Sequence, residues 1–421
     1  RDRAWAPRFG YAWRLSDRLV WRGGWGVFYV PNNVANFNQS GFSLSTRMVT
    51  SLDNNLTPFN RLADPFPNGL SRPPGAQGGL LTGVGQTLTA GAARIGDVPT
   101  YLNGLTQQFS MGFQVLLPGA VSVQSGYAGS VSQRLTISRD VNAYPQEFLA
   151  LKARLSASVP NPFYGIIIDT TSALSQRTTT VSQLLRPHPH FLGLTQTPLP
   201  YGRSHYDSLQ VQVTRRMSHG LYLGGAYTFS KFMEAISYLN ANDPKPARVI
   251  SDADRPHLLV LHGAYELPLG RGKHFLNAAH PAMRRLAGGW QFNWVVTFNS
   301  GAPLAFAGAE RLFKSTKNPK TVAQWFDVTQ FAPQEPFTLR QLSSRVADLR
   351  SPGIRKWDLS VIKGVPVTER VTLKLQAEFY NAWNTTHFGA PNTTVTGLSF
   401  GRLTTTPLGP REIQLAVRLA W

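Results

Sequence analysis

The sequence predicts an all-β protein: an antiparallel transmembrane β-barrel of outer-membrane type, with about 11 strands present and long extracellular loops. Three observations predict it. Apolar and polar residues alternate with a period of two in one segment after another. Short turns and long irregular connections join these segments in strict alternation. Only 15% of the 421 residues are charged, well below the roughly 25% of a soluble domain.

The composition excludes several classes of protein. The 42 Lys and Arg against 22 Asp and Glu give a net charge of +20, but the basic residues are dispersed, which argues against a nucleic-acid binder. With 0 Cys there is no disulfide, thiolate metal site or Cys nucleophile. No apolar run approaches the roughly 18 to 20 residues of a membrane helix. The first residues lack Met and an apolar signal segment, so we expect the chain to begin inside something larger.

Three hairpins are expected in the first half of the chain. In each, alternating residues lead to a short turn and resume after it. The hairpins span residues 8–29, 108–127 and 209–229, with turns at Ser16-Asp17, Pro118-Gly119 and Ser218-His219-Gly220.

The second half is expected to add five more strands. They cover residues 259–267, 290–298, 356–361, 371–379 and 413–421. A basic stretch near Arg271 to Arg285 joins the first two of them, and a turn near Gly364 to Thr368 joins the next two. The last strand alternates up to Trp421.

The long connections fall between the hairpins. They span roughly residues 31–104, 132–203, 233–254, 300–353 and 383–409. Outer-membrane barrels have short periplasmic turns and longer extracellular loops. If Trp421 ends on the periplasmic side, all the long connections therefore lie outside the cell.

The residues opposite the apolar face distinguish a barrel from a soluble β-sandwich, which is the alternative fold. Polar residues on that face would line a wet lumen, and the apolar faces are too aromatic for a small sandwich core. Leu375 is expected to face lipid near the bilayer midplane, and Gln376 the lumen. The charged residues of the polar face are Arg8, Arg14, Arg22, Arg216, His262, Glu266, Lys356, Lys374, Glu378 and Arg418. Tryptophans expected at the membrane interfaces are Trp13, Trp21, Trp290, Trp357, Trp383 and Trp421.

Many of these segments resemble TonB-dependent outer-membrane receptors, and in particular their Oar-like subgroup. The similarity spans most of the chain, with gaps in the long loops. The segments that carry it are Ala6-Pro7-Arg8-Phe9-Gly10-Tyr11-Ala12, Arg22-Gly23-Gly24-Trp25-Gly26-Val27-Phe28-Tyr29, Tyr206-Asp207-Ser208-Leu209-Gln210, Ala226-Tyr227-Thr228-Phe229-Ser230-Lys231, Ser251-Asp252-Ala253-Asp254-Arg255-Pro256-His257, Gly288-Gly289-Trp290-Gln291, Ser300-Gly301-Ala302-Pro303, Lys356-Trp357-Asp358-Leu359-Ser360, Glu378-Phe379-Tyr380-Asn381-Ala382-Trp383-Asn384 and Phe400-Gly401-Arg402-Leu403.

The resemblance implies that residues 1–421 are the C-terminal portion of a receptor barrel, with the plug and the N-terminal domains absent. A complete barrel of this kind has about 22 strands, roughly twice the number read here. An open strip cannot leave its edges in hydrocarbon. We therefore expect the strand near Phe9 and the strand ending at Trp421 to lie at seams with a missing barrel half.

The function implied is TonB-energised uptake of a scarce solute across the outer membrane of a Gram-negative bacterium. A siderophore, a glycan and a peptide-like ligand remain open, and the chain is not expected to be an enzyme or to hold a cofactor. The partners implied are membrane lipid, the missing plug and barrel half, TonB through that plug, and the barrel-assembly machinery through the strand ending at Trp421. The alternatives are a binding or adhesion barrel without energised transport and an extracellular lectin-like module.

No residue is assigned to a catalytic, cofactor, metal or ligand-binding role. His188 and His190 could form a metal pair, but no Asp or Glu lies nearby in sequence, and loop packing is favoured. Ser204, His205 and Asp207 could suggest a hydrolase, but neighbours in one strand cannot converge on one atom.

Three further segments receive structural interpretations. Gly23-Gly24-Trp25-Gly26 lacks the Lys-Ser/Thr of a phosphate loop and is interpreted as strand. Residues 145–155 predict a short helix with Pro in its first turn, packed over an extracellular loop. Pro160-Asn161-Pro162-Phe163-Tyr164-Gly165 either touches a ligand or anchors its own loop, and anchoring is favoured.

Overall fold

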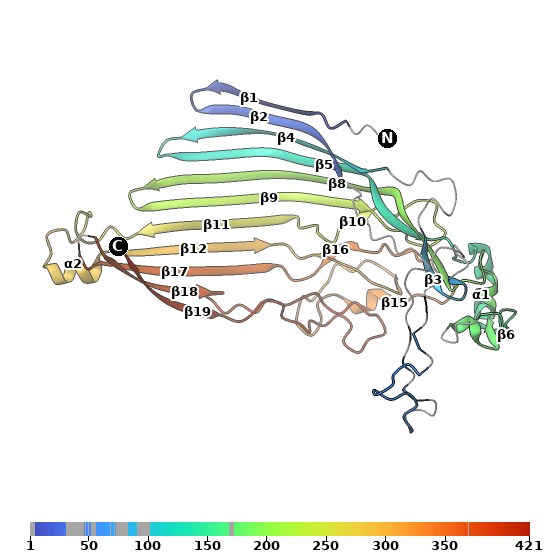
Figure 1. Cartoon of the computed structure of the whole chain (residues 1–421). Helices are drawn as coiled ribbons and strands as arrows, with labels where there is room; N and C mark the ends of the chain where they lie inside the picture. The colour runs from blue at the N-terminus through green and yellow to red at the C-terminus, as the bar shows by residue number, and fades with distance from the viewer. Residues whose placement is uncertain are drawn as a thin grey trace.

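A single large sheet dominates the computed structural model of the chain (Figure 1). The structure describes residues 5–30, 46, 48, 50–51, 56–67, 69–70, 72, 83–90, 102–167, 172–368 and 370–421. The sheet has 13 strands, of which β3 (Thr87–Ala90) and β10 (Val249–Ile250) lie off the main path. The strands of the main path, in spatial order, are β1 (Arg8–Ser16), β2 (Leu19–Val30), β4 (Gly104–Leu117), β5 (Val121–Asp140), β8 (Gly193–Ser218), β9 (Leu221–Ala235), β11 (His257–Glu266), β12 (Trp290–Asn299), β17 (Ile354–Pro366), β18 (Thr372–Tyr380) and β19 (Glu412–Ala420).

Every neighbouring pair along this path is antiparallel, so the chain runs as one continuous meander. β1 and β19 form its two ends, and within the described residues they are not paired with each other. The expected fold and the expected strand number of about 11 are therefore confirmed.

The register confirms the predicted assignment of faces. Phe9 lies opposite Trp25, and Trp25 lies opposite Phe109, so the apolar face continues from strand to strand. At the other end of the sheet Leu375 lies opposite Val417. Gln376 pairs with Ala416 on the other face. Large side chains of the apolar face are exposed, as a lipid-facing surface requires: Phe9 is 66% and Leu415 76% exposed.

The depth expected for Leu375 is wrong. Leu375 lies opposite Lys363, and Lys363 lies opposite Trp290, the first residue of β12. This row therefore sits at the end of the sheet that carries the short turns, and not at its middle. The alternation specifies which face a side chain occupies, but only the pairing register places it along the barrel axis.

The turns between hairpin strands gather at one end of the sheet and the long connections at the other (Figure 1). In the turn between β8 and β9, His219 and Gly220 have φ of 51° and 77°. Positive φ at both central residues defines the tight turn that suits the twist of a hairpin. The one large connection at this end joins β11 to β12 and contains α2 (Pro281–Ala287).

The extracellular connections contain short elements of their own. They are η3 (Gln146–Ser156), β6 (Ser158–Pro160), η4 (Ala173–Ser175), β7 (Thr178–Thr180), α1 (Val181–Leu184), β13 (Pro303–Leu304), β14 (Ala309–Arg311), η5 (Val328–Gln330), β15 (Phe331–Pro333) and β16 (Val346–Arg350). The connection expected over residues 31–104 falls largely outside the described residues.

Two sequence predictions about the loops need correction. Residues 132–203 are not irregular throughout, because β5 extends to Asp140 and β8 begins at Gly193. Register shifts beyond Ser132 interrupt the pairing of these extensions. At each shift the alternation of apolar and polar residues is broken, so the sequence does not show a strand there. The helix expected at 145–155 is a 3₁₀ segment interrupted at Lys152, whose φ is 47°.

In the part of the chain that the structure describes, no helix is long and apolar enough to cross a membrane. The largest buried apolar cluster belongs to the extracellular loops. It comprises Leu304, Phe306, Ala309, Phe326, Phe331, Val346 and Leu349.

Candidate functional site

The polar face of the sheet carries hydrogen-bonded charged groups. Lys356 Nζ lies 2.8 Å from Asp358 Oδ2, and Gln376 Nε2 donates to Glu378 Oε1 at 2.5 Å. Arg22 donates to Gln124 across β2 and β5. The hydroxyl of Tyr222 lies 3.1 Å from His262 Nε2. This face is therefore a wetted surface with paired charges, as expected of a barrel lumen.

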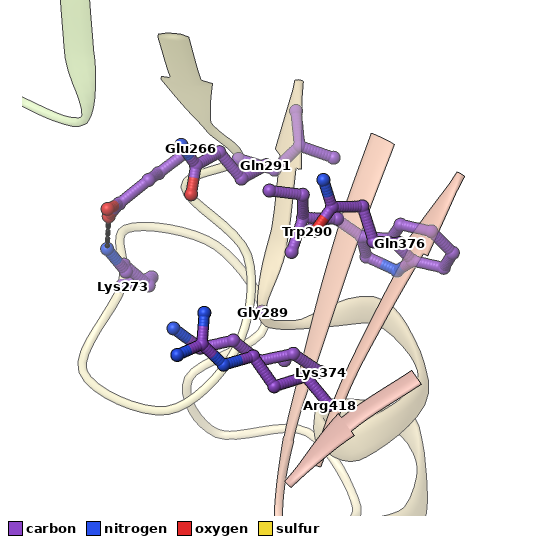
Figure 2. A pocket seen from close by; sticks show the side chains of 11 residues that line it. Glu266, Lys273, Gly289, Trp290, Gln291, Lys374, Gln376 and Arg418 are labelled. Atoms are coloured by element: carbon purple, nitrogen blue, oxygen red, sulfur yellow. Dashed lines mark hydrogen bonds and ion pairs between the residues drawn. The ribbon is translucent and has the colours of Figure 1, made fainter. Parts of the chain in front are cut away.

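A cavity of about 470 Å³ opens on this face at its periplasmic end (Figure 2). Lys374 and Arg418 are cross-strand partners, and Figure 2 shows their side chains side by side. Glu266 pairs with Lys273 at 3.0 Å, which leaves the charges of Lys374 and Arg418 without a carboxylate in the lining. The cavity therefore has an excess of positive charge, which favours anionic groups.

A second hollow of about 460 Å³ lies near the other edge of the sheet. Its lining combines Arg8 and Phe28 with Gln108, Ser130 and Tyr206 from the neighbouring strands. Arg8 lies over the Phe28 ring, 4.6 Å from its centroid. Gly24 and Gly26 keep the floor of this hollow open because they have no side chain.

A buried ion pair fixes the extracellular end of the sheet. Asp254 is 1% exposed, and its Oδ2 lies 2.6 Å from Nη2 of Arg350. Its Oδ1 accepts the Phe232 backbone N–H at 2.6 Å, and Arg350 also donates to the Gly301 carbonyl at 3.1 Å. The pair thus joins two connections that are far apart in sequence, residues 236–256 and 300–353, to the end of β9.

A second ion pair ties the same loop to β9. Arg345 Nη2 lies 2.5 Å from Oε1 of Glu234, and both side chains are largely buried. Next to it, the Asn240 side chain accepts the Arg340 N–H at 2.9 Å and donates to the Arg340 carbonyl at 3.2 Å. Together these contacts hold residues 300–353 against residues 236–256, so the loops present a defined surface outside the cell.

The centre of the 300–353 loop is an aromatic cluster. The Phe306 and Phe331 rings stack at 4.0 Å, and Phe326 and Phe400 meet them edge to face. Phe400 comes from the last long loop, so the cluster joins two loops. Such a core lets the loops fold as a unit above the barrel.

Charged residues at the surface of the loop cover this aromatic cluster. Arg311 donates to both carboxylate oxygens of Asp348 at 3.0 and 2.9 Å and lies over the Phe331 ring. These hydrogen bonds, and the added charge of Lys314, hold the pKa of Asp348 below its usual range. Hydrogen bonds from Thr329 and Ser315 lower the pKa of Asp327 in the same way.

Two of the family-like segments contact each other directly. Oδ1 of Asp358 accepts the backbone N–H of Asn381 at 2.9 Å. The Asn381 side chain accepts the Thr385 N–H at 3.0 Å and donates to the Thr385 carbonyl at 2.9 Å. Asn381 has a φ of 51°, which Asn tolerates better than most residues. These segments therefore shape the turn in which the chain leaves β18.

The pair His188 and His190 lies in a packed loop. Their rings are 6.0 Å apart, and the buried Asn142 side chain bonds the backbone of this turn at His188 and Phe191. Burial, with a smaller effect of His188, lowers the pKa of His190. Among the described residues, no group of three or more His, Cys, Asp or Glu could hold a metal ion. The geometry agrees with loop packing.

The Ser204, His205 and Asp207 set does not converge on one point. Ser204 pairs with Glu234 on the polar face, whereas His205 and Asp207 lie on the opposite face. There, His205 Nε2 lies 2.7 Å from Asp207 Oδ2, and the Tyr127 hydroxyl donates to Asp207. The set is therefore divided between the two faces of the sheet.

The glycine-rich run 23–26 is ordinary strand, paired on both sides. A Cβ at Gly23 would lie 2.6 Å from the Ser110 carbonyl oxygen and 2.7 Å from the Tyr11 hydroxyl, so the position needs glycine. The aromatic ring of Tyr11 covers it.

The segment 160–165 anchors its own loop, as favoured. The Asn161 amide donates to the Leu174 and Gln176 carbonyls, both at 2.7 Å. Arg177 lies 5.1 Å from the centroid of the half-exposed Tyr164 ring.

The residues that join the loops were not predicted from the sequence. Asp254 and Gly301 are in quoted segments, but their partner Arg350 lies in an irregular stretch without a pattern. Gly301 is required because a Cβ there would overlap the Ser351 carbonyl. The contact of Lys363 with the end of α2 was not predicted either. A basic residue at an apolar position of a strand could have indicated that this side chain has a polar partner.

The continuous apolar outer face, the polar inner face and the sorting of loops define a wall segment of an outer-membrane β-barrel. The chain belongs to the family described as outer membrane beta barrel domain, whose sequence model matches residues 1–414. Membership in this family places the chain in the outer membrane of a Gram-negative bacterium and supports the expectation that it is not an enzyme.

Several solved structures are similar to the chain. The outer membrane transporter YddB from Escherichia coli is 9% identical with a TM-score of 0.45, over 99% of this chain and 40% of that one. The siderophore receptor PirA from Acinetobacter baumannii is 10% identical with a TM-score of 0.43, over 99% and 41%. The chain thus spans less than half the length of these structures. No curated protein sequence matches it.

Proposed function

We propose that the chain is the C-terminal part of the barrel wall of a TonB-dependent receptor of the Oar-like subgroup. The whole protein takes up a scarce solute, and the energy arrives through a plug that contacts TonB. A plug and further strands complete the barrel, and the barrel-assembly machinery reads β19 up to Trp421. The match of residues 1–414 to the outer membrane beta barrel domain family supports this proposal.

One observation carries the uptake function. The polar face of the sheet extends from a loop surface joined by the Asp254–Arg350 ion pair to a cation-rich cavity at the periplasmic end. A protein that only adheres to a ligand needs the loop surface alone. A polar lumen face that ends in a positively charged cavity is expected when a solute moves through the barrel along that face.

Binding and adhesion without energised transport is the second candidate function. The rigid loop cluster around Phe306 and Phe331 favours it, since a folded extracellular unit can hold a partner without passing it on. The nature of the ligand, whether siderophore, glycan or peptide-like, follows from neither observation.

Uptake measurements separate the two functions. Cells that produce the full-length protein containing this chain are given labelled ferric siderophores, oligosaccharides and peptides, with and without a protonophore. For the ligand that binds, surface binding should persist with the protonophore while accumulation stops. Binding without any energy-dependent accumulation would refute uptake and establish adhesion.

A further inference from the structure

The connection between β11 and β12 is unlike the other periplasmic turns. It covers residues 267–289 and contains a short helix, whereas the β8 to β9 turn has only His219 and Gly220 between the strands. Arg271, Lys273, Arg284 and Arg285 lie in it, and Asp and Glu are absent from it. It is thus a basic insertion at the periplasmic end of the barrel.

Two side chains hold the end of α2 on the lipid side of the sheet. Lys363 and Trp290 are cross-strand partners, in the same row as Leu375, and so belong to the apolar face. Lys363 Nζ donates to the carbonyls of Arg285 at 2.6 Å, Leu286 at 3.0 Å, and Gly288. Trp290 Nε1 also donates to the Leu286 carbonyl at 3.0 Å. The charge of Lys363 is therefore covered by the helix, with the side chain only 7% exposed.

Lys374 and Arg418 lie on the polar face, whereas Lys363, which bonds the end of α2, lies on the apolar face with Leu375. The connection therefore passes around the rim of the barrel, from the lumen side at Lys273 to the lipid side at α2. Its packing is close, because a Cβ at Gly288 would lie 2.7 Å from the Arg284 carbonyl and 3.0 Å from the Leu269 carbonyl.

The surface of α2 away from the sheet is apolar and basic. Leu286 is 75% and Met283 54% exposed, and Arg285 is exposed beside them. Trp290, at the start of β12, marks the membrane interface, where tryptophan is enriched. The exposed apolar side chains thus continue the lipid-facing surface of the barrel at the level of the headgroups.

We propose that α2 is an interfacial anchor for the periplasmic leaflet of the outer membrane. Met283 and Leu286 enter the boundary between headgroups and acyl chains, and Arg285 binds the phosphates of anionic phospholipids. An apolar face with adjacent basic residues is the pattern of helices that lie in the membrane interface. Lys363 positions the helix and does not itself contact lipid. This anchor is independent of the solute and of energised uptake.

The test uses the full-length protein in vesicles of phosphatidylethanolamine and phosphatidylglycerol. This chain has 0 Cys, so one introduced thiol labels one site once any cysteines elsewhere are replaced. Leu286→Cys and Met283→Cys carry a bimane fluorophore, and Asp17→Cys, in the turn after β1, is the matched periplasmic control, its side chain being 92% exposed. Brominated acyl chains should quench bimane several-fold more at residues 283 and 286 than at residue 17.

Two further measurements identify the cause. Arg285→Gln, or vesicles of phosphatidylcholine alone, should weaken the quenching at residue 286. Lys363→Met should remove it by releasing the end of α2, while the barrel remains folded because Met suits a lipid-facing position. Quenching at residue 286 no greater than at residue 17 would overturn the proposal. Shielding of residue 286 from aqueous iodide without lipid quenching would also overturn it, and would identify a protein as the occupant.

Discussion

The buried carboxylate of Asp254 holds the 300–353 connection in place through its ion pair with Arg350. Replacing it by Asn keeps the shape of the side chain but leaves Arg350 without a counter-charge. Breaking a buried ion pair costs about 3 kcal/mol, so residues 300–353 should open more readily. Amide hydrogen exchange of this segment measures the change.

The exposed pair Arg14 and Asp17 provides the control, since their side chains are 68% and 92% exposed. Asp17→Asn should leave protection unchanged within about 0.5 kcal/mol. Equal effects of Asp17→Asn and Asp254→Asn would show that Asp254 does not hold the loop.

Asp348 should make the stability of the same loop depend on pH. Hydrogen bonds from Arg311 lower the pKa of this carboxyl in the folded state. Because the pKa of Asp348 is lower in the folded than in the unfolded state, its ionisation stabilises the loop. This stabilisation is complete at pH values above the unfolded pKa of about 4, and it is lost as the pH falls through the folded pKa. Asp348→Asn should therefore cost about 0.5 to 1 kcal/mol at pH 7 and nothing at strongly acidic pH.

Hydrogen exchange of residues 309–333, corrected for intrinsic rates, checks this dependence. Asp252→Asn, at an exposed position nearby, is the matched control. A cost of Asp348→Asn that persists at strongly acidic pH would refute the role of the charge.

The assignment of faces can be tested with one adjacent pair of residues in β8. Leu209 is 46% exposed and lies opposite Tyr127 and Phe229 on the lipid face, while the neighbouring Gln210 lies on the polar face. Leu209→Arg should cost about 2 to 4 kcal/mol and Gln210→Arg little, because this row lies farther from the short turns than the row of Leu375.

Unfolding of the reconstituted protein in denaturant measures both costs. Leu375→Arg should cost no more than about 1 kcal/mol, because the register places Leu375 near the periplasmic interface. Similar costs at residues 209 and 210 would mean that the register is wrong.

The strands could be predicted because the bilayer imposes a strict period of two on each of them. Beyond the membrane this period is no longer imposed, and the end of β5 was not predicted. The strand continues to Asp140 through several register shifts. The loop contacts could not be predicted either, since Asp254 and Arg350 are 96 positions apart and nothing in the local sequence links them. The quoted segments contained both partners of the contact between Asp358 and Asn381. They contained Asp254 but not its partner Arg350.

The two ends of the sheet determine whether the chain can form a barrel by itself. β1 and β19 each present one unpaired edge within the described residues, and β19 is exposed along nearly its whole length. Each unpaired backbone group in hydrocarbon costs several kcal/mol. The edges must therefore pair with strands that this meander does not supply.

Native mass spectrometry of residues 1–421, refolded in detergent micelles, tests this central claim most directly. We expect a mixture of oligomers and aggregates, because unpaired edges associate with one another. Addition of the remaining barrel strands should convert the mixture to a single species. A monodisperse monomer of the chain alone, stable to heat, would show that the edges are not open and would establish a small closed barrel in which β1 pairs with β19.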